Sequence, residues 1–429
     1  MAVQDDLNRV GEVFGELVQN NRLNAECRVY NKEMTDIVNA YKSQRANWDN
    51  QPDVTENAFP SATQSLWYSH YLNKRRLRNL GIETRCEKMG MTTYPPEENQ
   101  RLYIRYEHDG RNLICKIVEP LRYRKVYYQN GRQIGRDGSE GRDCEYYVIR
   151  SQAVTGRCIC PKCGYEDTIE NLVDGCDYCH TKFHIQDFDG KVSSIYMPND
   201  NKRSRDNNPF KKFNTVLYII VVLIAFPILI SIPILGIPLI FLGLIIFLSV
   251  YLTRAGKLNM KEGAGRSRET VAKIRKVDPL FSAEYLIGNL TNKLESIYYA
   301  DRMEDIGAFT YCDISPYIAR NRNVFGFNLL ECVLMDYTQD ERSQTLEVQA
   351  AVQLLALTER GMGKGEERIR LRLAKSPAAK TSAVNDIAVY TCQSCGASVS
   401  LLNGGHCEYC GGRMDMFRYD WVITGFGQV

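Results

Sequence analysis

The chain has 429 residues, of which 44% are hydrophobic and 24% are charged, and its formal net charge is +3. This length suits two or three domains, and the composition excludes a chain that is disordered throughout. A net charge this close to zero gives no general reason to expect a nucleic-acid partner. Asp5 and Asp6 stand where a signal peptide would become apolar, and an Arg-rich transit peptide is also missing. We therefore expect an internal segment to target the protein.

Residues 1–155 have the pattern of an α+β domain. Apolar residues recur at helical spacing in residues 7–18 and 34–41. Strands are predicted at 102–107, 112–119, 122–129 and 144–152, with hairpin signals at Asp109-Gly110 and Asn130-Gly131. Five tyrosines of these strands either pack against the sheet, as β propensity favours, or line a groove: Tyr123, Tyr127, Tyr128, Tyr146 and Tyr147.

Eight of the fifteen cysteines form four C-x-x-C pairs, and the pairs come in two sets. The first cluster is Cys160, Cys163, Cys176 and Cys179, and the second cluster is Cys392, Cys395, Cys407 and Cys410. Two residues between paired cysteines let both sulfurs face one ion, and four thiolates leave no open position for water. We therefore predict two zinc ribbons with two structural Zn2+ ions. Redox or disulfide chemistry is the weaker alternative, because no export signal is present.

One pair of the first cluster departs from the pattern of the other three. Glycine follows three of the pairs, where it accepts the positive φ of a tight turn: Gly164, Gly396 and Gly411. His180 follows Cys179 instead. The sequence leaves open whether His180 or His184 replaces Cys179 as a ligand. The remaining cysteines are predicted to be small buried hydrophobic residues.

Residues 213–253 are 41 consecutive positions without a charged side chain. A straight helix of this length would span about 60 Å, twice the roughly 30 Å core of a bilayer. Pro227, Pro233 and Pro238 favour a break near the middle. Lysines and arginines flank both ends, so both ends are expected on the cytoplasmic side. The prediction is a transmembrane helical hairpin; a single tilted span and a buried soluble hairpin are the alternatives.

The region from 277 to 390 also has helices followed by strands. Asp278-Pro279 predicts a helix start, and apolar residues continue at helical spacing to Tyr298, followed by a shorter helix over 301–309. Alternating apolar residues then predict antiparallel strands around 330–334, 346–352 and 369–373, each with one buried face. The glycine-rich run 361–365 lies between strands and is predicted to be a hairpin, because phosphate binding would need a following helix.

The run DPLFSAEYLIGNLTNKLESIYYADRMEDIGAF, with the strands FNLLECVLMDY and QTLEVQAAVQLLALTER, resembles the domain of the mitochondrial inner-membrane translocase subunit 44 family. That family belongs to the nuclear transport factor two-like superfamily. The resemblance implies a cone-shaped α+β domain with a concave pocket in a membrane-associated tether or adaptor. Because the chain combines this pattern with zinc ribbons and a hairpin and shows no transit peptide, we expect a bacterial membrane relative.

The predicted fold is α+β, with two cone-like helix-plus-antiparallel-sheet bodies, each carrying a zinc ribbon, joined by the transmembrane helical hairpin. The two bodies are expected to be related by internal duplication. The predicted domains are 1–155 (α+β), 156–195 (first ribbon), 196–212 (basic linker), 213–253 (hairpin), 254–276 (basic linker), 277–390 (α+β) and 391–429 (second ribbon and terminal strand).

These features favour a non-enzymatic adaptor in the cell membrane, multi-pass with both termini cytoplasmic, that binds a protein partner and anionic lipid head groups. No Walker loop, dinucleotide fingerprint or paired histidine motif is present, so no catalytic residues are predicted. A nucleic-acid-binding ribbon protein is one alternative, although the second cluster has only Arg413 and Arg418 as nearby cations. An enzyme that uses one carboxylate in the cone-shaped pocket is the other. The sequence does not decide whether the chain forms homo-oligomers.

Overall fold

The structure is a computed structural model. It describes residues 21–51, 59–98, 100–108, 112–151, 157–160, 163–168, 171, 176–180, 190–197, 262–379, 390–392, 394–395, 398–399, 407, 410–412 and 415–428. The predicted hairpin at 213–253 and the predicted helix at 7–18 lie outside these residues. Among the residues described, no helix is both long and apolar enough to cross a bilayer. Residues 1–198 and 270–429 belong to one compact unit. We call its described parts the first half (21–197) and the second half (270–428).

The first half contains a five-stranded antiparallel sheet with the order β1-β3-β4-β7, in which β2 also pairs with β3. Asn130 and Gly131 have positive φ angles of 51° and 73° and close the β3–β4 hairpin, as the Asn-Gly signal predicts. The elements are η1 (Cys27–Tyr30), α2 (Asn31–Asn50), α3 (Gln64–Asn79), β1 (Ile82–Met89), β2 (Tyr103–His108), β3 (Asn112–Gln129), β4 (Arg132–Ser151), β5 (Arg157–Ile159), β6 (Glu166–Thr168) and β7 (Lys191–Tyr196).

The second half contains a four-stranded antiparallel sheet with the order β13-β10-β9-β8. The alternating apolar pattern predicted its three long strands correctly, although each extends beyond the predicted core. The elements are α7 (Glu262–Arg275), α8 (Ala283–Tyr299), η3 (Met303–Asp305), α9 (Ser315–Arg320), β8 (Val324–Gln339), β9 (Gln344–Thr358), β10 (Gly361–Lys375), β11 (Tyr390–Thr391), β12 (Ser398–Val399), η4 (Met416–Arg418) and β13 (Val422–Gln428).

The two halves share one strand order. In each half the cysteine cluster follows the third strand of the main path, and a fourth strand then pairs with that third strand: β7 with β4, and β13 with β10. A short two-stranded ribbon accompanies each cluster, β5–β6 in the first half and β11–β12 in the second. This correspondence is consistent with the predicted internal duplication. It also places each cluster as an insertion between two paired strands.

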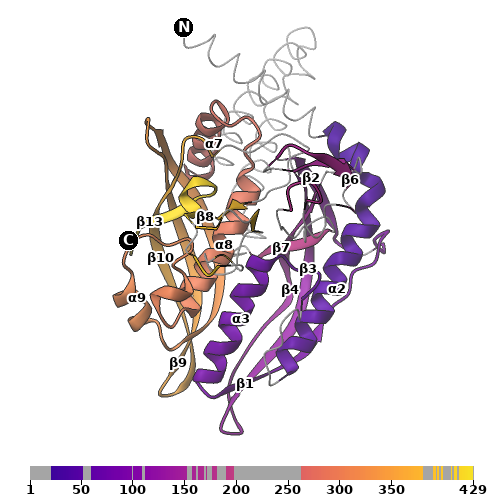
Figure 1. Cartoon of the computed structure of the whole chain (residues 1–429). Coiled ribbons are helices and arrows are strands. Elements are labelled where there is room, and N and C mark those ends of the chain that lie inside the picture. The colour runs from indigo at the N-terminus through magenta and orange to yellow at the C-terminus, as the bar shows by residue number, and fades with distance from the viewer. Residues whose placement is uncertain are drawn as a thin grey trace, which may run out of the picture. The chain divides into compact units, whose positions relative to one another are not determined.

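Helices α3 and α8 contact each other and lie between the two sheets (Figure 1). Leu72 of α3 is buried in the apolar core of the second half. Asn73 donates to the Phe325 carbonyl at 2.8 Å, and Arg76 donates to the Ala300 carbonyl at 2.6 Å. Because α3 belongs to the first half and these acceptors to the second, the two predicted bodies interlock within one unit.

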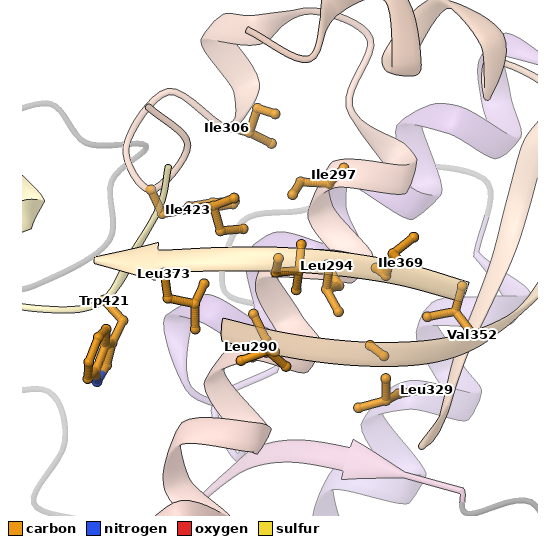
Figure 2. Packing of buried hydrophobic residues seen from close by; sticks show 14 of the residues in the cluster. Leu290, Leu294, Ile297, Ile306, Leu329, Val352, Ile369, Leu373, Trp421 and Ile423 are labelled. Carbon is orange, nitrogen blue, oxygen red and sulfur yellow. The ribbon is translucent and has the colours of Figure 1, made fainter. Parts of the chain in front are cut away.

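The largest apolar core lies between α8 and the second sheet. Figure 2 shows Leu290, Leu294 and Ile297 of α8 beside buried residues of the strands. Along β9 the buried apolar side chains alternate, as a half-buried strand requires: Leu346, Val348, Ala350 and Val352. Trp421 and Ile423, which follow the second cluster, join the same core.

Several local predictions differ from the structure. Ser282, not Asp278, is the N-cap of α8, and its hydroxyl accepts from the Tyr285 amide at 3.2 Å. Asp278 is instead buried beside Lys375, at 3.5 Å. The shorter helix expected at 301–309 is reduced to the 3-10 turn η3. Helix α3 and strand β1 were not predicted, because α3 is rich in basic and amide side chains and lacks a clear apolar face.

Candidate metal centres

The first cluster brings its four predicted cysteines together. The Sγ atoms of Cys160 and Cys179 are 3.8 Å apart, and those of Cys163 and Cys176 are 3.7 Å apart. All four sulfurs lie within 4.8 Å of one another. Cys160 and Cys176 are buried, and Cys163 is exposed. Strands β5 and β6 lie on either side of the first cysteine pair in the chain, and the fold keeps the four thiols close together.

The backbone at His180 bears on the open question about Cys179. His180 has φ +54°, close to the values of +75° for Gly164 and +69° for Gly411. Its backbone amide donates to the Cys176 carbonyl at 2.8 Å, as the Gly411 amide does to the Cys407 carbonyl at 2.8 Å. His180 therefore occupies the turn position that glycine takes in the other pairs, and Cys179 is the residue whose sulfur joins the cluster. His184 lies outside the residues described.

The second cluster has the same geometry. The Sγ atoms of Cys392 and Cys410 are 3.6 Å apart, and those of Cys395 and Cys407 are 3.7 Å apart. Burial opposes ionisation of the Cys392 thiol, but the backbone amides of Cys395 and Ser394 lower its pKa to about 6. The Gly412 amide lowers the pKa of Cys410, but hydrogen bonds with the other three thiols raise it to about 12, so the first proton is lost from the Cys392 side of the cluster. A thiol that ionises readily is a better metal ligand, since the thiolate is the binding form.

The distances in both clusters fit a tetrahedral metal ion. Four sulfurs at about 2.3 Å from a central ion lie about 3.8 Å from one another. The sulfur pairs above, at 3.6–3.8 Å, match the edges of such a tetrahedron. Disulfide bonds would need about 2.0 Å, and all the cysteines that the structure describes are free. Each cluster can therefore hold one metal ion with four thiolate ligands.

The second cluster is continuous with the body of the second half. Buried Cys392 and Cys407 pack with Met416 and Val422, and Val422 begins β13. The Ser376 amide at the end of β10 donates to the Phe417 carbonyl at 2.7 Å. Order in this cluster is thus coupled to the edge of the second sheet.

The strand tyrosines divide between the two predicted roles. Tyr123, Tyr127 and Tyr146 line a cavity between the halves, whereas Tyr147 is buried and donates to Glu145 at 2.8 Å. Tyr128 packs under the Arg85 guanidinium. Sequence reasoning missed the polar residues that share the cavity with these tyrosines, because they come from helices far apart in the chain. The only sign of them in the sequence was that charged and amide residues occur within helices whose apolar residues predict packing against a sheet.

In comparisons with known proteins, no protein-family model, curated protein or solved structure matches the chain. The resemblance to the translocase subunit 44 family therefore stays a prediction. What the structure contributes is the α+β fold with curled antiparallel sheets and the two four-cysteine clusters.

Proposed function

We propose that the protein is a membrane-anchored adaptor, stabilised by two structural Zn2+ ions, that holds its compact unit at the cytoplasmic face of the cell membrane and binds a protein partner there. The proposal rests on the unit that forms from both sides of the charge-free segment 213–253. Closed four-thiolate sites support a structural role for zinc, because no position is left for a reacting water.

The packing of the two halves supports a hairpin over a single span. Strand β7 precedes the charge-free segment and α8 follows it, yet the Asn292 amide of α8 donates to the Ser193 carbonyl of β7 at 2.7 Å. A folded unit lies on one side of a bilayer. A segment that leaves this unit and returns to it must cross an even number of times, which a hairpin does and a single span does not.

An exposed aromatic pair on the first ribbon supports a protein partner. The rings of Tyr165 and Tyr178 stack with centroids 5.5 Å apart, and Tyr178 is 72% exposed. Exposed aromatic side chains are enriched in protein–protein interfaces. Their neighbours Glu166, Asp167 and Asp177 are acidic, which disfavours the nucleic-acid alternative because phosphates need a basic surface.

Replacement of 213–253 by a flexible Gly/Ser linker tests the anchor. We expect the full-length protein in the membrane fraction and the variant in the soluble fraction, folded and with two Zn2+ ions per chain. Reporters fused to each terminus of the full-length protein should both be inaccessible from outside the cell. Accessibility of either terminus would contradict the hairpin, and a chain purified without zinc would contradict the metal assignment.

Cross-linked pull-downs test the partner. The variant Y165S/Y178S should lose a stoichiometric partner that the unmodified protein retains. Tyr103 offers a matched control, because it is 57% exposed but lies on β2 and not on the ribbon. Retention of the partner by Y165S/Y178S would move its site elsewhere, and recovery of no stable partner would contradict the adaptor proposal.

A further inference from the structure

A cavity of about 210 Å³ lies between the two halves. Its walls come from α2, α3, β1, β3, β4 and β7 of the first half and from α8, β8, β9 and β10 of the second. Engineered protein cavities of roughly 150 Å³ accept benzene, so this cavity has room for a small organic molecule. Its lining is not apolar, however, and the polar atoms on its walls are not all satisfied.

The α8 wall presents one hydrogen-bond acceptor that lacks a donor among the described residues, near a buried carboxylate. The side-chain amide of Asn292 donates to Ser65 Oγ at 2.6 Å and to the Ser193 carbonyl at 2.7 Å, so its Oδ1 can act only as an acceptor. This oxygen is buried and has no partner in the part of the chain that the structure describes. Three residues further along α8, the Glu295 carboxylate accepts from Ser69 Oγ at 2.7 Å. A buried acceptor without a donor is costly, and one that lies near a buried carboxylate favours a donor-rich group between them.

The α2 and β3 walls carry an excess of positive charge. Asp49 accepts from Lys125 Nζ at 2.8 Å and from Arg45 Nε at 3.3 Å. One carboxylate thus pairs with two cations, and the charge of Glu295 on α8 also acts on Arg45. Arg45 forms no ion pair with Glu295 among the residues described, yet its charge and that of Lys125 favour the ionised form of Glu295 against the effect of burial. The cavity lining therefore combines two cations on α2 and β3 with the Glu295 carboxylate on α8.

His70 supplies a third unsatisfied atom. Its Nε2 is 2.6 Å from the Tyr41 hydroxyl, while its Nδ1 is buried without a partner among the residues described. Burial, and then the charges of Arg45 and Lys125, hold the pKa of His70 well below its ordinary value, so the ring is neutral. A neutral ring offers one hydrogen bond to a bound molecule and does not change the charge balance.

We infer that this cavity binds a small zwitterion of the amino-acid class, with its ammonium group at Asn292 Oδ1 and Glu295 and its carboxylate toward Arg45 and Lys125. An ammonium has three donors, which can serve the unpartnered Asn292 Oδ1 and the Glu295 carboxylate together. A carboxylate is the partner that a guanidinium binds best, through charge-assisted hydrogen bonds. An amino acid carries both groups on one carbon, so it can contact the two cations and the Glu295 carboxylate of this lining at the same time. The inference does not depend on the membrane anchor or on the protein partner.

Calorimetric titration of the full-length protein with the free L-amino acids tests the ligand class. We expect saturable binding by at least one of them, with one site per chain. The N-acetyl derivative, which lacks the ammonium, and the amide derivative, which lacks the carboxylate, should each bind at least about tenfold more weakly, because one charge-assisted contact is lost. Absence of binding by every amino acid, or equal binding by either derivative, would overturn the inference.

The variant E295Q tests the position of the ammonium. Glutamine keeps an oxygen that accepts from Ser69 but removes the charge, so affinity should fall roughly 10- to 100-fold. The matched control is E284Q, on the same helix but outside the cavity lining, which should leave affinity unchanged. If E295Q binds like the unmodified protein, Glu295 does not hold the ammonium and the inference fails.

Two further measurements separate ligand binding from misfolding. Both variants should retain two Zn2+ ions, and E295Q should melt no lower than the unmodified protein, because Glu295 is costly to ionise where it lies. The variant R45K keeps a cation but loses the guanidinium fork, and it should weaken binding of the amino acid while leaving the amide derivative unchanged. An equal effect of R45K on both compounds would place the carboxylate elsewhere and overturn the assignment.

Discussion

The two halves share a strand order but differ in what they bury. In the second half, apolar residues of α8 and of the sheet form one large cluster that includes Leu294 and Val352. In the first half, several buried ion pairs lie among the apolar residues: Lys42 pairs with Glu119, and Asp49 pairs with Arg45 and Lys125. The second half buries the pair Asp278–Lys375 as well, outside its large apolar cluster. The strand order alone therefore does not determine how apolar or how charged the interior of a half is.

This difference has a physical consequence. Burying an apolar side chain contributes to stability in proportion to its area, whereas a buried ion pair returns little beyond its own desolvation cost. We interpret the second half as the part that mainly stabilises the unit. The first half, with its charged interior next to the cavity, is the part whose chemistry is specialised.

Removal of one metal site should show the largest difference in stability between the two ribbons. C407S in the second cluster and C176S in the first should each reduce the zinc content from two ions to one. Binding free energies of structural zinc in peptides are about 10–16 kcal/mol, so we expect a destabilisation of several kcal/mol for C407S, whose site is continuous with β13. C176S should lower the melting temperature less. Equal shifts in thermal denaturation would show that the clusters are coupled to the unit to the same degree.

Disruption of the buried pair Lys42–Glu119 should have the next largest effect. K42M leaves the Glu119 carboxylate without its cation, which typically costs about 3–5 kcal/mol. Chemical denaturation would measure this loss, and K42M/E119M should recover most of it. Burial raises the pKa of Glu119, so in K42M the native state takes up a proton before the unfolded chain does. The stability of K42M should therefore rise as the pH falls toward the unfolded value of about 4.3.

Truncation of matched leucines compares the two interiors directly. L294A should cost about 2–5 kcal/mol in urea denaturation, because Leu294 is fully buried in the second core. L66A should cost less, although Leu66 is also buried, because Leu66 lines the cavity and its removal enlarges an existing space. A larger loss for L66A would contradict the assignment of the second half as the stabilising part.

The smallest effect is expected for E295Q in the absence of ligand. Burial raises the pKa of Glu295, opposed by the hydrogen bond from Ser69 and by Arg45 and Lys125. The native state therefore holds its proton to a higher pH than the unfolded chain, and the contribution of Glu295 to stability falls as the pH rises through that window. E295Q should match the unmodified protein near pH 4 and exceed it at pH 7 by on the order of 1 kcal/mol. Denaturation at the two pH values would measure this, and a constant difference would contradict the raised pKa.

Much of the second half and both cysteine clusters could be predicted from local sequence. The C-x-x-C spacing identified all eight clustered cysteines, and the period-two pattern identified β8, β9 and β10. The start of α8 was placed four residues early, because Asp278 has the sequence of an N-cap but is used in a buried ion pair. Helix α3 was missed because its buried face contains His70, Asn73 and Arg76, which apolar periodicity does not detect.

The sequence by itself determined the elements whose residues interact locally: the cysteine pairs, the Asn-Gly turn and the alternating strands. Only the tertiary structure decided that both halves form one unit, that β7 and β13 return beside β4 and β10, and that Arg45, Asn292 and Glu295 share one cavity. The physical reason is the sequence distance between the residues that interact. A turn or a metal knuckle depends on neighbours within a few residues. A charge on α2 and a carboxylate on α8 can act together only when packing brings them into one cavity.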